Sequence, residues 1–211
     1  MLSLHFVRHG QTDFSKRNCF CGQIDPPLNS TGEAMAAAFA QKWGAAKWAG
    51  IVASPLLRTR QTAAATATLA GLTVETDPGL IEIGYGSWEG RSEEEVEKTE
   101  NEAFHAWARN PGFSSPPGGE SAYAIAARAL AAVGRIHDKY VDGNILVVSH
   151  KATLRVLVCA LLGLDVNLFR ARVNMPVASL TIIDFKKVGP MLRLLGDTSH
   201  LPPELAASEG T

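Results

Sequence analysis

The sequence predicts an α/β protein, a three-layer α/β/α sandwich whose central sheet is mostly parallel and ends in an antiparallel edge strand. Short apolar runs bounded by turn residues alternate along the chain with segments that carry helix signals. This order is typical of a parallel sheet covered on both faces. Near the C-terminal end two apolar runs follow one another across Gly189-Pro190, and such a hairpin supplies the antiparallel edge.

Each expected element has a local reason. Strands are predicted where short apolar runs lie between turn residues, and helices where capping residues precede a helical periodicity. Thr31 and Ser92 are candidate N-caps, and acidic side chains follow Ser92 in the first turn. In order, the predicted elements are strand Ser3–Val7, helix Thr31–Trp43, strand Gly50–Ser54, a helix starting near Pro55, strand Leu72–Thr76, helices Ser92–Ala108 and Ser121–Tyr140, strand Asn144–Ser149, helix Lys151–Leu162 closed by Gly163, and strands Ala178–Phe185 and Met191–Leu195.

Length and composition favour one domain. The chain has 211 residues, of which 46% are hydrophobic, so it can bury a sizeable core. No repeat or linker composition divides it, and residues 1–211 are expected to form a single domain. The Pro-, Gly- and Ser-rich loop Asn110–Gly119 and the loop Ser15–Gln23 are expected to lie near a site entrance.

Charge and hydropathy exclude several partners. Twenty Lys and Arg against 21 Asp and Glu give a net charge of −1, which argues against a nucleic-acid groove. Arg8 interrupts the N-terminal apolar run too early for a signal peptide, and no run is long enough for a membrane helix. We therefore expect a soluble, cytoplasmic protein without membrane contact. The apolar final strands could pair across a homodimer.

The cysteines and most histidines fit structural roles. Cys19, Cys21 and Cys159 form neither a disulfide framework nor a paired metal motif, so all three are expected to be reduced. We predict no metal and no cofactor. His5 alternates with apolar neighbours and is expected in the core. The remaining histidines outside strand ends are expected to be structural or exposed: His105, His137 and His200.

Polar side chains gather where strands are expected to end. Arg8 and His9 follow the first strand, Arg58 lies in the first turn of the helix after the second, and His150 ends the long apolar strand near position 149. Glu82 follows another apolar pair. Alone, each is more typical of a surface turn. Because ligands of open α/β sheets bind at the carboxyl ends of strands, their co-occurrence indicates one site.

These residue types suit phosphoryl transfer. The planar guanidinium group of arginine matches the geometry of phosphate oxygens and neutralises charge in the transition state. A neutral imidazole can attack phosphorus and carry it covalently, while a second, protonated imidazole donates to an oxygen. A glutamate can protonate the departing alkoxide and then deprotonate water. Cations and helix N-termini can replace a metal.

The chain lacks a P-loop, a full dinucleotide fingerprint, a Gly-x-Ser-x-Gly elbow and the acidic clusters of two-metal phosphatases.

The same residues resemble ordered motifs of the histidine phosphatase superfamily, in its phosphoglycerate-mutase-like branch. The similarity runs from residue 3 to about 201, and six segments carry it: Leu4–Thr12, Ala53–Thr62, Leu80–Gly90, Pro117–Ser121, Val147–His150 and Asp197–Leu201. The resemblance implies His9 as phosphorylated nucleophile, Arg8 and Arg58 as phosphate ligands, Glu82 as acid and base, and His150 as second pocket histidine. It also places the following residues in phosphate or substrate binding: Thr12, Ser15, Cys21, Gly22 and Lys151.

Three positions depart from the family pattern. Ser15 stands where mutases usually have asparagine, Gln23 where an aromatic is familiar, and Lys151 where glycine is common. These changes concern substrate recognition more than phosphoryl chemistry. The compact, acidic stretch after Glu82 resembles the phosphatase members. The resemblance therefore implies metal-independent hydrolysis of a small phosphomonoester, of the phosphoserine, α-ribazole-phosphate or broad-specificity type. The alternatives are a cofactor-dependent phosphoglycerate mutase and a non-catalytic phospho-ligand-binding protein.

Overall fold

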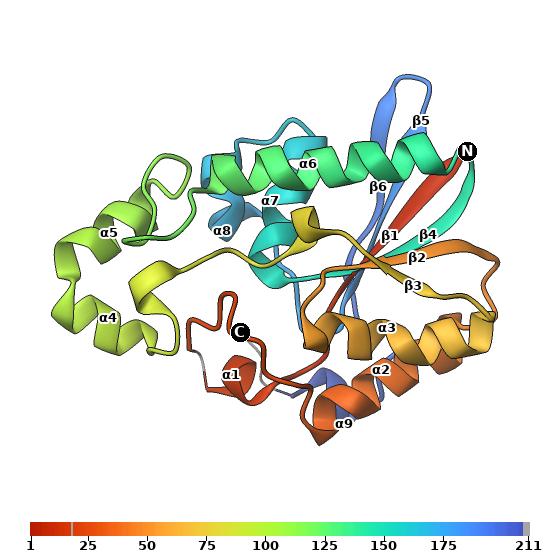
Figure 1. The fold of residues 1–211 in the computed structure, drawn as a ribbon, viewed down its shortest axis with the longest axis horizontal. Coiled ribbons are helices and arrows are strands. Elements are labelled where there is room, and N and C mark those ends of the chain that lie inside the picture. The colour runs from red at the N-terminus through yellow and green to blue at the C-terminus, as the bar shows by residue number, and fades with distance from the viewer. Residues whose placement is uncertain (18, 209–211) are drawn as a thin grey trace.

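The computed structural model describes residues 1–17 and 19–208. Figure 1 shows a central sheet with helices on both faces and a helical extension, α4 and α5, beyond one end. The strands are β1 (Leu2–Arg8), β2 (Trp48–Ala53), β3 (Val74–Thr76), β4 (Gly143–Ser149), β5 (Leu180–Lys186) and β6 (Gly189–Asp197). The helices are α1 (Asp13–Lys16), α2 (Ser30–Trp43), α3 (Leu57–Ala70), α4 (Glu93–Thr99), α5 (Asn101–Arg109), α6 (Ala122–Lys139), α7 (Lys151–Leu161), α8 (Phe169–Arg172) and α9 (Pro203–Ala206), with 3-10 turns at Pro78–Leu80, Gly86–Trp88 and Val166–Leu168.

The sheet is mostly parallel. Its strand order within the described residues is β3-β2-β4-β1-β5-β6. The pairs β2–β3, β2–β4 and β1–β4 are parallel, and β5 is antiparallel to both β1 and β6. The predicted α/β class is confirmed. The antiparallel edge consists of two strands, since β5 is antiparallel to β1 and β6 is antiparallel to β5.

Alternating side chains of the strands build a core on each face of the sheet. On β1, Leu4 and Phe6 join one cluster with residues of α6 and α7, whereas Val7 joins the other with Phe39 of α2 and Ala63 of α3. Burial on both faces is expected for strands whose sequence is a continuous apolar run. Helices cover both faces in Figure 1, which gives three layers.

Local caps and turns differ from prediction at three places. Asn29, not Thr31, caps α2, because its side chain accepts from the Gly32 N–H at 2.9 Å. The helix expected over 92–108 is divided at Glu100, whose φ of −133° and ψ of 43° are not helical. Ser92 caps α4 as predicted. Gly189 and Pro190 begin β6 and do not form the turn.

The described segments include no helix with both the length and the apolar character needed to cross a membrane.

Candidate active site

The carboxyl ends of β1 and β4 bring two histidines together. Arg8 and Ser149 are register partners in these parallel strands, so the next residue of each strand lies at the same edge. The His9 N–H donates to the Ser149 carbonyl at 3.0 Å, and the His9 and His150 rings are 5.2 Å apart between centroids. The strand register therefore sets the spacing of the two imidazoles.

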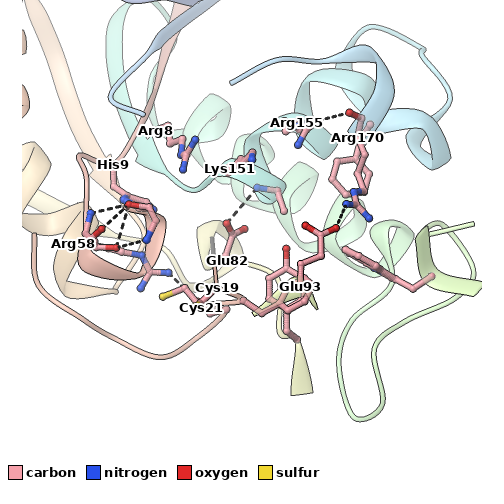
Figure 2. A pocket seen from close by; sticks show the side chains of 18 residues that line it. Arg8, His9, Cys19, Cys21, Arg58, Glu82, Glu93, Lys151, Arg155 and Arg170 are labelled. Carbon is pink, nitrogen blue, oxygen red and sulfur yellow. Dashed lines mark hydrogen bonds and ion pairs between the residues drawn. The ribbon is translucent and has the colours of Figure 1, made fainter. Parts of the chain in front are cut away.

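A cavity opens at this edge of the sheet, and Figure 2 shows the side chains that line it. It receives residues from β1, α1, α3, α4, α5, α7 and α8 and from the loops before α2 and α4. All of the predicted site residues except His150 line it: Arg8, His9, Thr12, Ser15, Cys21, Gly22, Arg58, Glu82 and Lys151. His150 is fully buried behind His9.

His9 has one nitrogen committed to the backbone. Its Nδ1 lies 2.7 Å from the Gly10 carbonyl oxygen. Because a carbonyl can only accept, Nδ1 carries the proton and Nε2 keeps its lone pair. Burial, and then the charges of Arg58 and Arg8, hold the pKa of His9 well below its usual range. The imidazole is therefore neutral, and the lone pair of Nε2 is available.

Two buried arginines flank this histidine, and both are tied to backbone carbonyls. Arg58 donates from Nη1 to the Ile24 carbonyl and from Nη2 to the Gly22 carbonyl, each at 2.8 Å. Arg8 donates from Nη1 to the Met175 carbonyl at 2.8 Å. Burial lowers the pKa of Arg8 to about 10, so it remains charged at neutral pH.

His150 forms a hydrogen bond with Ser54, the residue that follows β2. Its Nε2 is 2.8 Å from the hydroxyl of Ser54, which also accepts from the Leu56 N–H at 3.3 Å. The imidazole Nδ1 has no hydrogen-bond partner in the described part of the chain. Burial, and then Arg58 and His9, lower the pKa of His150 well below its usual range.

The carboxylate of Glu82 is seated on the first turn of α7. It accepts from the Thr153 N–H and Thr153 hydroxyl, each at 3.1 Å, and from the Ala152 N–H at 3.3 Å. The Ile83 N–H donates at 2.9 Å. The first amides of a helix lack intrahelical partners and can donate to a carboxyl group. The N-terminus of α7 therefore fixes Glu82 beside the cavity.

The segment between β1 and α2 shapes one wall of the cavity. Thr12 and Ser15 cap α1 reciprocally, with the Thr12 N–H donating to Ser15 Oγ at 2.9 Å. Burial raises the pKa of Cys21 to about 11, so its thiol is neutral. Gly22 has a φ of +51°, and a Cβ there would lie 2.1 Å from a Glu89 carboxylate oxygen. All three cysteines are free thiols.

Gln23 and the predicted entrance loop both lie against the segment after Glu82. The Gln23 side chain donates to the Glu82 carbonyl at 3.3 Å. Residues 110–119 do not line the cavity. That loop packs behind Tyr85, where Ser87 donates its N–H to the Pro117 carbonyl at 3.0 Å. The outer wall is formed by α4, α5 and α8 in its place.

Sequence reasoning missed this outer wall. Arg155 and Arg170 line it together with aromatic residues. A positional signal existed for Arg155, because it lies four residues after Lys151 and so shares its helix face. Nothing local marked Arg170, which lies on the short helix α8. The histidines expected outside the site are placed as predicted: His5 and His200 are buried, His137 is exposed, and His105 faces Glu97 at the surface.

Metal-ligating side chains are not gathered in the described segments, where no group of three or more His, Cys, Asp and Glu could hold an ion.

Known proteins resemble the chain along most of its length. Residues 4–198 match the model of the histidine phosphatase superfamily, branch 1. Phosphoserine phosphatase 1 of Hydrogenobacter thermophilus is 30% identical over 201 residues, 95% of each chain. A protein of Yersinia enterocolitica named "Probable phosphoglycerate mutase GpmB" is 32% identical over 206 residues, 95% of each chain. The mycobacterial glucosyl-3-phosphoglycerate phosphatase in complex with VO3 has a TM-score of 0.86 and 28% identity, covering 94% of this chain and all of that one.

Proposed function

The chain belongs to branch 1 of the histidine phosphatase superfamily, and from that membership we propose that it is a metal-independent phosphomonoester hydrolase with His9 as nucleophile. One observation carries the assignment of His9. Its Nδ1 is bound to the Gly10 carbonyl, which leaves Nε2 as a lone-pair nitrogen in a cavity that Arg8 and Arg58 also line. A dianionic phosphoryl group fits between the two guanidinium groups.

The first step forms a bond between His9 Nε2 and phosphorus and breaks the bond from phosphorus to the ester oxygen. Protonated Glu82 gives its proton to the departing alkoxide, which leaves as an alcohol. Arg8, Arg58 and the Nδ1–H of His150 stabilise the charge on the non-bridging oxygens. Because both arginines are already hydrogen-bonded to carbonyls, they require little rearrangement.

In the second step water attacks phosphorus, and the bond to His9 Nε2 breaks. Glu82, now a carboxylate, accepts the proton of that water and returns to its protonated form. Inorganic phosphate then leaves. Thr12, Ser15, Cys21, Gly22 and Lys151 complete the substrate-binding wall in this proposal.

The proposed substrate is a small phosphorylated metabolite, of the phosphoserine, α-ribazole-phosphate or broad-specificity type. The name of the Hydrogenobacter relative supports a phosphatase. The name of the Yersinia relative keeps phosphoglycerate mutase as second candidate. A non-catalytic binding protein is less supported, since every catalytic position is filled. A cytoplasmic location, a single domain and a homodimer stay predictions.

Hydrolysis of p-nitrophenyl phosphate tests the proposal directly. We expect His9→Ala to abolish turnover, and wild-type protein quenched during turnover to carry acid-labile phosphate on His9. His105→Ala is the matched control, because His105 is partly exposed and lies outside the cavity lining. Substantial activity in His9→Ala would refute the covalent route. With 3-phosphoglycerate, release of phosphate indicates a phosphatase, and formation of 2-phosphoglycerate a mutase.

A further inference from the structure

We propose that Lys151, Arg155 and Arg170 form a second anion-binding subsite in the outer half of the cavity, which selects phosphomonoesters that carry a carboxylate or a second phosphate. This inference rests on the proposed function, because it concerns the part of the substrate beyond the ester oxygen. It adds a substrate class to the phosphoryl chemistry.

The three cations come from two elements and reach one cavity. Lys151 begins α7, and Arg155 follows one turn later on the same face. Arg170 belongs to α8. All three line the cavity that contains His9, and Figure 2 shows Lys151 between Arg8 and the pair Arg155 and Arg170. The cations therefore continue outward from the phosphoryl site.

The carboxylates of the cavity do not balance these charges. Glu82 and Glu93 are the acidic residues in its described lining. Glu82 is bound by amides of α7, and Glu93 lies 3.3 Å from Arg170. The phosphoryl group engages Arg8 and Arg58 in the inner half. Within the described residues neither Lys151 nor Arg155 forms an ion pair with a carboxylate, and Glu82 acts on both only at longer range.

Lys151 shows the imbalance most clearly. Its ammonium makes no hydrogen bond or ion pair with the described residues. Burial, and then the neighbouring Arg8 and Arg155, lower the pKa of Lys151 to about 8. An ammonium group held near other cations is stabilised when an anion binds beside it. A substrate carboxylate or phosphate would supply that anion.

The two arginines are fixed before any ligand binds. Arg155 donates from Nε to the Val173 carbonyl at 2.7 Å and from Nη2 to the Arg170 carbonyl. The Arg170 guanidinium lies over the Trp107 ring, 4.2 Å from its centroid. Rigid, oriented cations recognise a small anion better than flexible surface chains, because less side-chain entropy is lost.

Three ligands that differ in the group at the second anionic position test the subsite. 3-Phosphoglycerate has a carboxylate where glycerol 3-phosphate has a CH₂OH group, and glycerol bisphosphate carries a second phosphate. Titration calorimetry on His9→Ala protein measures their dissociation constants without turnover. We expect one or both ligands with a second anionic group to bind about tenfold more tightly than glycerol 3-phosphate, because a hydrogen bond to a charged group contributes at least that much. Whichever ligand shows the gain identifies the anion.

The preference should disappear in His9→Ala/Lys151→Met and persist in His9→Ala/Lys42→Met, whose lysine lies in the last turn of α2. Arg170→Gln is a second variant expected to reduce the preference. Equal affinities for the three ligands, or a preference unchanged by Lys151→Met, would overturn the subsite. Failure of the proposed function looks different, because wild-type protein would then release no phosphate even from p-nitrophenyl phosphate while the affinities still report on the subsite.

Discussion

The hydroxyl of Ser54 lies 2.8 Å from Nε2 of His150, and this contact joins the ends of two neighbouring strands. Ser54 Oγ has one proton and accepts from the Leu56 N–H, and the proposed mechanism has it donate that proton to Nε2 of the imidazole. Nε2 then accepts, and the ring proton sits on Nδ1, which is free of protein partners among the described residues. In the proposed mechanism this Nδ1–H donates to a phosphoryl oxygen.

Replacing Ser54 by Ala should therefore weaken catalysis through His150. Without the hydroxyl, Nε2 loses its donor and the Nδ1–H tautomer is no longer enforced. We expect kcat/KM for p-nitrophenyl phosphate to fall about tenfold, because the hydrogen bond from Ser54 to His150 is lost. Imidazole ¹⁵N shifts of His150 report the tautomer, and an unchanged tautomer in Ser54→Ala would contradict this role.

Substitution of Glu82 by Gln should separate substrates by their leaving groups. An alkoxide needs a proton as it departs, whereas p-nitrophenolate leaves without one. We expect a loss of about 100-fold or more on glycerol 3-phosphate and a clearly smaller loss on p-nitrophenyl phosphate. Glu94→Gln, at an exposed position of α4, serves as control. Equal losses on both substrates would mean that Glu82 is not the acid.

Activity should survive exhaustive treatment with EDTA. In the proposed mechanism the buried guanidinium groups of Arg8 and Arg58 supply the positive charge that a metal supplies in other phosphatases. Phosphate release is measured before and after chelation and dialysis into metal-free buffer. A complete loss that Mg²⁺ or Zn²⁺ restores would show that the reaction depends on a metal.

Acid should destabilise the fold partly through His5. This side chain packs edge-on against Trp43 and Trp48, with ring centroids 6.2 and 5.0 Å away. Burial lowers the pKa of His5 from 6.5 to about 4, and Arg193 contributes. The unfolded chain thus takes up the proton first as pH falls. The stability that depends on neutral His5 is present above pH 6.5 and is lost progressively toward pH 4.

Urea unfolding at pH 7, 6 and 5 measures this effect. In His5→Leu the free energy of unfolding should fall less steeply with acid than in wild type, by at most about 1.4 kcal/mol per pH unit. His137→Leu replaces an exposed histidine of α6 and should keep the wild-type slope. Parallel slopes for wild type and His5→Leu would disprove the assignment.

The inner part of the site could be predicted because it follows strand ends. Arg8, His9 and His150 come directly after buried apolar runs, and parallel register places such positions together. The outer part depends on contacts between distant segments. Arg170 reaches the cavity from the four-residue helix α8, and backbone carbonyls within and directly after this helix accept hydrogen bonds from the Arg155 side chain. No local periodicity in the sequence predicts that helix.

The predicted helix boundaries were wrong for a similar reason. The break at Glu100 coincides with hydrogen bonds from the Trp88 indole and from Arg91 to its carboxylate, which no local pattern reveals. At the start of α2, three consecutive residues can cap a helix, and Asn29 is the one whose side chain reaches a free amide. Propensity alone does not choose among them.

The carbonyl partners of Arg8 and Arg58 have a thermodynamic consequence. These hydrogen bonds immobilise both guanidinium groups when the chain folds, so an arriving phosphate ester orders few side chains and its binding entropy is correspondingly less unfavourable. The same bonds tether the backbone at Gly22, Ile24 and Met175. Ligand affinity is thus linked to the order of these loops, and a substitution that loosens them should weaken phosphate binding even though every cation is retained.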